Sequence, residues 1–277
     1  SINKSMLGND VIADLNATIG MNRLSTEVTD KLNQEKTTTN YNAPSVGSLL
    51  AVPYGTDAPP GYSLYQRGEP RELVWEEKAP VSVARSVYDG VEILNSKIYI
   101  IGGHTSGNLT ERFDPMSNTI ETLTSMSTSR VGVASTVFNQ KIYAIGGQGL
   151  SSVEVFNDLT DQWTSASDLP NIVDRGTAIT HDEQIYLIGG RNSIGQDINQ
   201  TILFNYSSNT WLNRASMLTK RHSHKLVSFE GRIWAIGGWN ESSDSALNQV
   251  ESYDPVTNSW RLEESLNRLR AWSVAWV

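Results

Sequence analysis

A Gly-Gly dipeptide recurs four times along this 277-residue chain, and its spacing constrains the fold more than any other feature. The pairs begin 44, 43 and 48 residues apart, at Gly102, Gly146, Gly189 and Gly237. Each pair follows a short apolar run with an aromatic residue three places before the first glycine, at Tyr99, Tyr143, Tyr186 and Trp234. A repeat of this length indicates an array of similar supersecondary units.

Other residue types keep the same period. An arginine precedes each pair by 14 to 17 residues, and a further arginine begins a fifth unit: Arg85, Arg130, Arg175, Arg221 and Arg270. An aromatic residue follows each pair, at Phe113, Phe156, Phe204 and Tyr253. A tryptophan slot closes the units, at Trp75, Trp163, Trp211 and Trp260, with Ile120 in the remaining one. The slot lies 10 residues before the next arginine in four cases and 12 before Arg175.

Each unit contains short runs rich in Val, Ile, Tyr, Trp and Thr, separated by turn sequences, which predicts antiparallel strands. The apolar run 97–101 is expected to be an inner strand with sheets against both faces. The glycine pair after it supplies positive φ and close backbone approach near a crowded axis. The slot tryptophan suits an outer strand, where its ring covers the gap between sheets. Four-stranded sheets repeated radially form a propeller.

The pattern aromatic-x-Ile-Gly-Gly, then an aromatic, then Trp, resembles the kelch repeat over about residues 75–277. The resemblance implies an all-β kelch β-propeller with four recognisable blades and one incomplete blade. The fifth unit begins at Arg270 and stops at Val277, and the amino side offers only an outer strand near 72–75. We therefore expect the chain to be a fragment of a longer protein; the alternative is a ring completed by another chain.

The first 36 residues hold a second repeat with a period of 17. Its apolar positions advance by four and predict two short amphipathic helices: Leu7, Val11, Leu15, Leu24, Val28 and Leu32. Helices of this length need a partner surface. That surface is either the chain's own propeller or, as we favour, other copies in an oligomeric and possibly trimeric stalk.

A Pro/Gly-rich connector over residues 37–74 joins the helical repeats to the propeller. Its segments 44–50 and 58–64 resemble the collar of phage tail fibres, which implies a trimeric fibre. An ordinary ordered linker is the alternative. The resemblance favours an extracellular or cell-surface location, on a bacterium or a phage fibre.

The amino-acid composition excludes several classes of partner and of chemistry. The net charge of -8 argues against nucleic acid and anionic membranes, and no apolar run is long enough to span a bilayer. The absence of cysteine excludes thiol catalysis and the Cys–Tyr crosslink that the copper oxidases with kelch propellers require. We therefore expect no cofactor.

The repeated arginines are the leading candidates for a ligand site, because rotational repetition would place all five in a ring around one end of the axis. In kelch substrate adaptors, matching arginines line a pocket for acidic peptides, so the resemblance implies an anion clamp. The alternative is that each arginine bridges adjacent blades by hydrogen bonds to backbone carbonyls. The residues after the glycine pairs vary and would lie on loops suited to recognition: His104, Gln148, Arg191 and Trp239.

No catalytic constellation stands out in the sequence. His222 and His224 would share a strand face and could form half a metal site, but no spacing supplies a third ligand, which favours a structural role. We therefore expect a non-enzymatic binding head that recognises glycan or protein, with no metal. One alternative is a sugar-modifying kelch enzyme resembling a mutarotase. Another is an intracellular kelch adaptor, which would require a helical BTB-type domain that 74 preceding residues do not accommodate.

Overall fold

The computed structural model describes residues 77–87, 90–273 and 275. Nearly all of them belong to one compact unit, Lys78–Val277, which is built from four four-stranded antiparallel sheets and a two-stranded ribbon. The predicted helical stalk (1–36) and connector (37–74) lie outside the described residues and stay predictions.

Each sheet keeps the order of the sequence, so its strands form a simple meander. The first sheet contains β1 (Val91–Leu94), β2 (Lys97–Ile101), β3 (Thr110–Asp114) and β4 (Thr119–Leu123). The second contains β5 (Ala134–Phe138), β6 (Lys141–Ile145), β7 (Val153–Asn157) and β8 (Gln162–Ala166). The third contains β9 (Thr177–His181), β10 (Gln184–Ile188), β11 (Thr201–Asn205) and β12 (Thr210–Arg214). The fourth contains β13 (Lys225–Phe229), β14 (Arg232–Ile236), β17 (Val250–Asp254) and β18 (Ser259–Leu262), with the ribbon β15 (Trp239–Asn240) and β16 (Ser245–Ala246) inserted after β14.

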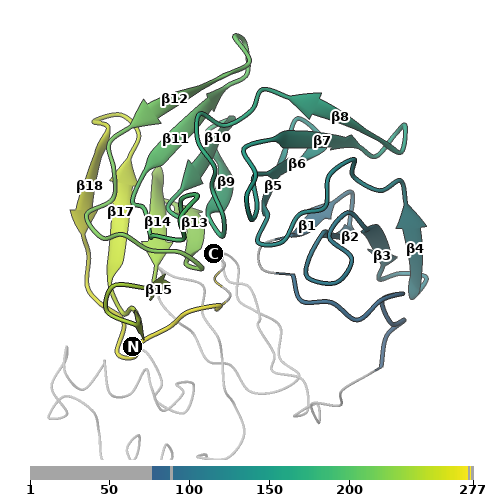
Figure 1. The fold of residues 1–277 in the computed structure, drawn as a ribbon, viewed down its shortest axis with the longest axis horizontal. Helices are drawn as coiled ribbons and strands as arrows, with labels where there is room; N and C mark the ends of the chain where they lie inside the picture. Colours follow the sequence, from purple (N-terminus) through teal and green to yellow (C-terminus); the bar gives the residue numbers. More distant parts are fainter. Residues whose placement is uncertain (1–76, 88–89, 274, 276–277) are drawn as a thin grey trace, which may run out of the picture. The chain divides into compact units, whose positions relative to one another are not determined.

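The sheets are arranged around a common axis (Figure 1). Their first strands contact one another in the order β1, β5, β9 and β13, and the last strands β4, β8, β12 and β18 lie at the periphery. The run 97–101 is the second strand of its sheet, so it is an inner strand as expected, while β1 lies closer to the axis. The innermost strand β1 is less buried than β2, because its Val91 and Ile93 side chains are exposed.

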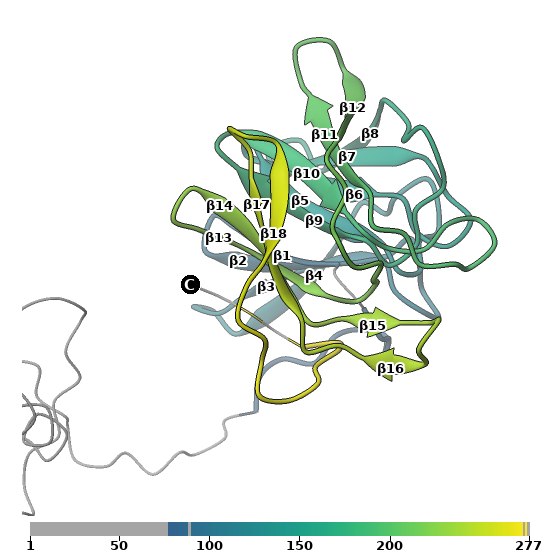
Figure 2. The ribbon, with the colours of Figure 1, turned by 90° about the vertical axis from the view of Figure 1, so that its left-hand side faces the viewer.

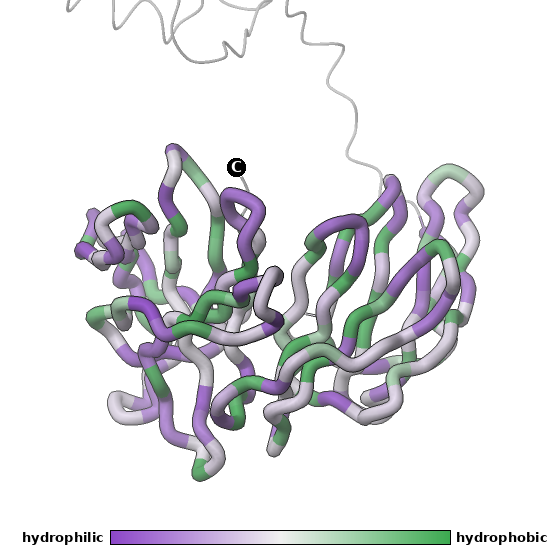
Figure 3. Tube along the Cα trace, turned by 90° about the horizontal axis from the view of Figure 1, so that it is seen from above, coloured by the Kyte–Doolittle hydropathy of each residue, from purple (hydrophilic) through white to green (hydrophobic). Residues whose placement is uncertain are grey.

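The hydrophobic core fills the spaces between neighbouring sheets. One cluster packs Tyr143 and Ile145 of the second sheet with Ile185 and Leu187 of the third, and further clusters join the first sheet to the second and the third to the fourth. Along the strands, hydrophobic segments alternate with hydrophilic turns (Figure 3). Burial between sheets thus accounts for the apolar second strands.

The three slot tryptophans that the structure describes, Trp163, Trp211 and Trp260, lie on the outermost strands, as predicted, whereas Trp75 lies outside the described residues. Trp163 on β8 packs on Phe156 with ring centroids 5.1 Å apart, and its Nε1 donates to the Thr124 carbonyl of the first sheet at 3.0 Å. Trp260 on β18 donates in the same way to the Ala215 carbonyl of the third sheet at 2.9 Å. Each ring therefore ties its own sheet to the preceding one.

The glycine pairs have the predicted positive φ, as at Gly146 (62°) and Gly147 (115°). A Cβ on Gly146 would lie 2.5 Å from the Val173 carbonyl oxygen, in the loop that enters the next sheet. A Cβ on Gly147 would lie 3.0 Å from the Val131 carbonyl oxygen, in the loop that enters its own sheet. Each pair thus passes between two inter-sheet loops that leave no room for side chains.

Candidate functional site

The loops that carry the candidate residues gather at one end of the sheets. Because the strands alternate in direction, the loops after β2, β6, β10 and β14 share an end with the loops between sheets. Figure 2 shows the β15–β16 ribbon at this end and the β11–β12 turn at the opposite end. We call the end that carries the glycine pairs the loop face.

The four residues after the glycine pairs lie on the loop face, each held by its backbone. His104 and Gln148 are exposed, whereas Arg191 and Trp239 are half-buried. The N–H of each donates to the loop that enters the same sheet, as from Gln148 to the Val131 carbonyl at 2.8 Å. The backbone at these positions is therefore uniform, while the side chains differ.

Arg130 is completely buried and holds its own sheet together. Its Nη1 donates to the carbonyl oxygens of Gly146 (2.7 Å) and Ser152 (2.8 Å), and its Nη2 donates to Glu154 Oε1 at 3.0 Å. Burial lowers the pKa of Arg130 below its usual value. Burial opposes ionisation of Glu154, but hydrogen bonds from the backbone and side chain of Ser127 and from Arg130 outweigh it and lower the Glu154 pKa.

The same buried pair occurs in two more sheets. Arg221 donates to the Gly237 and Gln249 carbonyls and pairs with Glu251, and both side chains are fully buried. Arg85 pairs with Glu111 at 2.5 Å, with side chains only 1% and 0% exposed. The expectation that these arginines form an open anion clamp is therefore corrected: they bond carbonyls and a glutamate, and they do so within one sheet rather than across blades.

Arg175 does not occupy the arginine slot of the third sheet. The second glycine of each pair donates to the slot residue of the next sheet, from Gly103 to Arg130 O, from Gly190 to Arg221 O and from Gly147 to Val173 O. Val173 therefore fills the slot, 10 residues after Trp163. The 12-residue spacing to Arg175 signalled this shift.

In the third sheet a hydrophobic pair replaces the charged pair. Val173 is 2% exposed and shares a core cluster with Ile202, which stands at the strand position of Glu154 and Glu251. Pro170 stands three residues before the slot, where Ser127 and Leu218 donate an N–H to the glutamate. Proline lacks that N–H. Val173, Ile202 and Pro170 therefore replace the arginine, the glutamate and the N–H donor of the charged pair together.

Two residues beyond the slot, backbone hydrogen bonds join the equivalent residues of successive sheets in an arc around the axis. Gly132, Arg175, Ser223 and Trp272 all have positive φ, at 68°, 52°, 50° and 51°. Arg175 N donates to Gly132 O at 2.9 Å, Ser223 N to Arg175 O at 3.2 Å and Trp272 N to Ser223 O at 3.2 Å. Val87 stands at the equivalent position of the first sheet, one residue after the Ser86 carbonyl that accepts from His104 N. We call Val87, Gly132, Arg175, Ser223 and Trp272 the axial ring.

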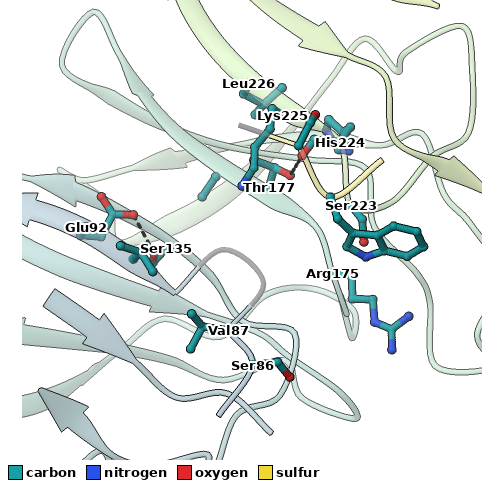
Figure 4. A pocket seen from close by; sticks show the side chains of 14 residues that line it. Ser86, Val87, Glu92, Ser135, Arg175, Thr177, Ser223, His224, Lys225 and Leu226 are labelled. Carbon is teal, nitrogen blue, oxygen red and sulfur yellow. Dashed lines mark hydrogen bonds between the residues drawn. The ribbon is translucent and has the colours of Figure 1, made fainter. Parts of the chain in front are cut away.

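The axial ring borders a cavity of about 640 Å³, the axial pocket. Glu92, Thr177 and Lys225 of the first strands line its wall, and Val87, Arg175, Ser223 and Trp272 line it from the ring. Figure 4 shows Glu92 and Ser135 across the pocket from Thr177 and Lys225. The Ser135 hydroxyl donates to Glu92 at 2.6 Å. The pocket therefore offers carboxylate, ammonium and guanidinium groups.

Arg175 and Trp272 are the accessible members of the ring. The Arg175 side chain is 27% exposed, against 0% for Arg130 and Arg221, and its Nε lies 3.8 Å from Asp174 Oδ2. Trp272 is 55% exposed, and its ring centroid lies 5.3 Å from that of Trp239. Of the five predicted arginines, Arg175 is thus the one that lines the pocket, while Arg270 is an exposed slot residue whose carbonyl accepts from Gly238 N at 2.7 Å.

The two histidines do not share a strand face, because both precede β13 and the bend at Ser223 separates them. His222 Nδ1 lies 2.7 Å from Asp197 Oδ1, and both side chains are buried. His224 is fully buried, and burial, together with Arg221, Lys225 and His222, lowers its pKa well below the usual value. Within the part of the chain that the structure describes, no three His, Cys, Asp or Glu side chains group to hold a metal ion.

Comparison with known proteins relates these features to one repeat family. The Kelch motif matches residues 129–170, 175–218 and 220–267. Kelch-like protein 36 of Bos taurus is 28% identical over 203 residues, covering 67% of this chain and 33% of the relative. Kelch-like protein 23 of Mus musculus is 25% identical over 202 residues, covering 69% and 35%. The chain thus spans about a third of the length of these relatives.

A solved structure, that of YjhT, has the same fold, with a TM-score of 0.60 at 16% identity over 70% of this chain and 69% of the other. The motifs, the relatives and the repeated sheets together support a kelch-repeat β-propeller. The described residues contain no helix with the length and apolar character of a membrane span.

Proposed function

We propose that this propeller is a non-catalytic recognition head that binds its ligand at the axial pocket. One observation carries the proposal: four members of the axial ring, Gly132, Arg175, Ser223 and Trp272, share one backbone geometry, while their side chains differ completely. A rigid repeated scaffold with varied side chains around a cavity is suited to recognition.

The pocket chemistry favours a ligand that carries a carboxylate. Arg175 offers a planar guanidinium and Lys225 an ammonium group, while Trp272 provides an aromatic face beside them. Glu92 on the opposite wall would bind a donor group of the same ligand. A segment of a partner protein or an acidic glycan meets these requirements.

The sequence repeats favour presentation of this head on an oligomeric stalk. The stripes through Leu7 and Leu24 would bundle identical chains, and several heads on one stalk would bind a surface by avidity. We propose an extracellular or cell-surface role on this basis.

The test is a screen of the 277-residue chain against arrays of acidic and neutral peptides and glycans. A Ser223→Trp variant places at Ser223 the side chain that Trp272 carries at the same φ, and so fills the pocket without new backbone strain. We expect acidic probes to bind the wild type and not the variant. Unchanged binding by Ser223→Trp would contradict the assignment of the pocket.

A mutarotase-like activity is the second candidate, because the pocket places the Glu92 carboxylate opposite basic groups. It predicts accelerated exchange between the anomers of a carboxylated sugar such as glucuronic acid. Exchange NMR distinguishes the two functions, since a recognition head binds without raising the exchange rate.

A further inference from the structure

A second cavity on the loop face, of about 560 Å³, lies between the second and third sheets. Three loops line it. Ser151 comes from the β6–β7 loop, Asn171 and Ile172 from the β8–β9 loop, and Asn192, Ile198 and Gln200 from the β10–β11 loop. None of these residues borders the axial pocket. We call this cavity the amide groove.

The lining of the amide groove carries no charged side chain. Asn171 and Gln200 supply amide groups that both donate and accept hydrogen bonds, and Ser151 adds a hydroxyl. The amide of Asn192 is engaged within its own loop. Ile172 and Ile198 add apolar surface. An ionic ligand would lose hydration here without gaining a counter-charge, whereas an uncharged polar ligand could form hydrogen bonds.

The walls of the amide groove are held in place by their own hydrogen bonds. Asn192 Oδ1 accepts from Ile194 N at 3.1 Å and from Gln196 N at 2.9 Å, which closes the tip of the β10–β11 loop. Ile198 N donates to Gly190 O at 2.9 Å. The groove is therefore largely preformed, which reduces the entropy lost on binding.

One amide group in the lining of the groove lacks a hydrogen-bond partner within the part of the chain that the structure describes. The Gln200 Nε2 atom is buried and has no hydrogen-bond partner among the described residues. A buried donor without a partner is unfavourable, because it has lost its hydrogen bonds to water. A ligand hydroxyl in the groove would supply the acceptor after a small rotation of the terminal amide.

The amide groove also lies where the third sheet departs from the others. Pro170 and Val173 flank the groove residues Asn171 and Ile172, and they replace the residues that engage a buried glutamate in the other three sheets. The loss of that charged pair leaves the β8–β9 loop with neutral side chains from Pro170 to Val173.

We propose that the amide groove binds an uncharged saccharide. Neighbouring hydroxyls of a sugar each donate and accept, which matches paired amides, and the C–H face of a sugar ring packs on Ile172 or Ile198. This site is independent of the axial pocket, so either can exist without the other.

The test is saturation-transfer NMR on the full 277-residue chain with lactose, maltose, cellobiose and diacetylchitobiose. We expect at least one disaccharide to receive saturation from the wild type. Ser193→Trp, which places a large ring on an exposed residue of the groove wall, should abolish the signal. Asn171→Ala should weaken binding at least about fivefold through loss of one exposed amide.

Ser207→Trp is the matched control, because Ser207 is an exposed serine on the β11–β12 turn at the opposite end. It should bind as the wild type does. The proposal is overturned if no neutral disaccharide receives saturation, if Ser193→Trp and Asn171→Ala both bind normally, or if an uncharged Gly-Ser-Asn peptide binds the groove in place of the sugars.

Discussion

At the residue scale, three sheets contain a buried Arg–Glu pair and the third contains Val173 and Ile202 instead. The buried pairs are costly to desolvate, and they persist because carbonyls accept from the arginine Nη atoms and loop N–H groups donate to the glutamates, although the arginine Nε atoms stay without partners among the residues that the structure describes. The third sheet shows that the same backbone also forms around apolar side chains.

Arg130→Ala should therefore destabilise the protein by about 3–5 kcal/mol, because it leaves Glu154 buried without its cation. The triple variant Ser127→Pro, Arg130→Val and Glu154→Ile copies the third sheet and should recover most of that loss. Urea denaturation measures both. An Arg130→Ala variant within about 1 kcal/mol of the wild type would refute the structural role.

His224 occupies a core position that Val133 fills in the second sheet, one residue after the axial ring. The folded state keeps its pKa far below the ordinary value of 6.5, so below that pH the unfolded chain binds a proton that the folded protein does not. Stability therefore falls with acidification, by up to about 1.4 kcal/mol per pH unit from this group.

His224→Val should be within about 1 kcal/mol of the wild type at pH 8 and more stable than it at pH 5. Urea denaturation between pH 5 and pH 8 checks this crossover. Parallel pH profiles for the two proteins would show that His224 does not titrate as its burial requires.

Residue type and spacing along the chain point to different residues for the arginine slot of the third sheet. Residue type favours Arg175, whereas the constant spacing of 10 residues from the tryptophan slot favours Val173. Burial of Arg130 and Arg221 could not be predicted from residue type, since arginine is usually exposed. The repeated glutamates Glu111, Glu154 and Glu251 were the missing signal, because a buried arginine needs a partner.

At the element scale, each glycine pair passes between two loops that leave no room for a side chain. The loss of stability on adding a side chain there can be measured. Gly146→Ala should destabilise by about 3 kcal/mol or more, because the new Cβ would lie 2.5 Å from the Val173 carbonyl oxygen. Gly149→Ala is the matched control, with φ of 75° and nothing within 4 Å of the new Cβ.

The control should lose only the strain of a left-handed alanine, about 1–2 kcal/mol. Thermal denaturation of both variants gives the difference. Equal losses would mean that φ alone, and not the close approach of the Val173 loop, requires Gly146.

The strand pattern was predictable because periodic apolar runs and turn residues mark the strands directly. The order of strands from the axis was not, because a run such as 97–101 is apolar in any position buried on both faces. Only the contacts among β1, β5, β9 and β13 identify the innermost strands.

At the scale of the whole molecule, the amino-terminal repeats predict assembly. The full chain has a mass of 30.6 kDa, and light scattering should give a multiple of it, three being the fibre-like expectation. The triple variant Leu24→Ser, Val28→Ser and Leu32→Ser should shift the mass towards that of one chain, because the second predicted helix then lacks its apolar stripe. A monomeric wild type would contradict the stalk.

The central claim is that the axial ring recognises the ligand, and the affinity of an Arg175→Ser variant tests it most directly. Serine is the residue that Ser223 presents at the same φ, so the fold should be unchanged. Arg214→Ser, on the exposed outer strand β12, is the control. By calorimetry with an acidic probe from the array screen, we expect Arg175→Ser to weaken binding at least about tenfold and Arg214→Ser to leave it unchanged. Equal affinities for both variants would contradict the account.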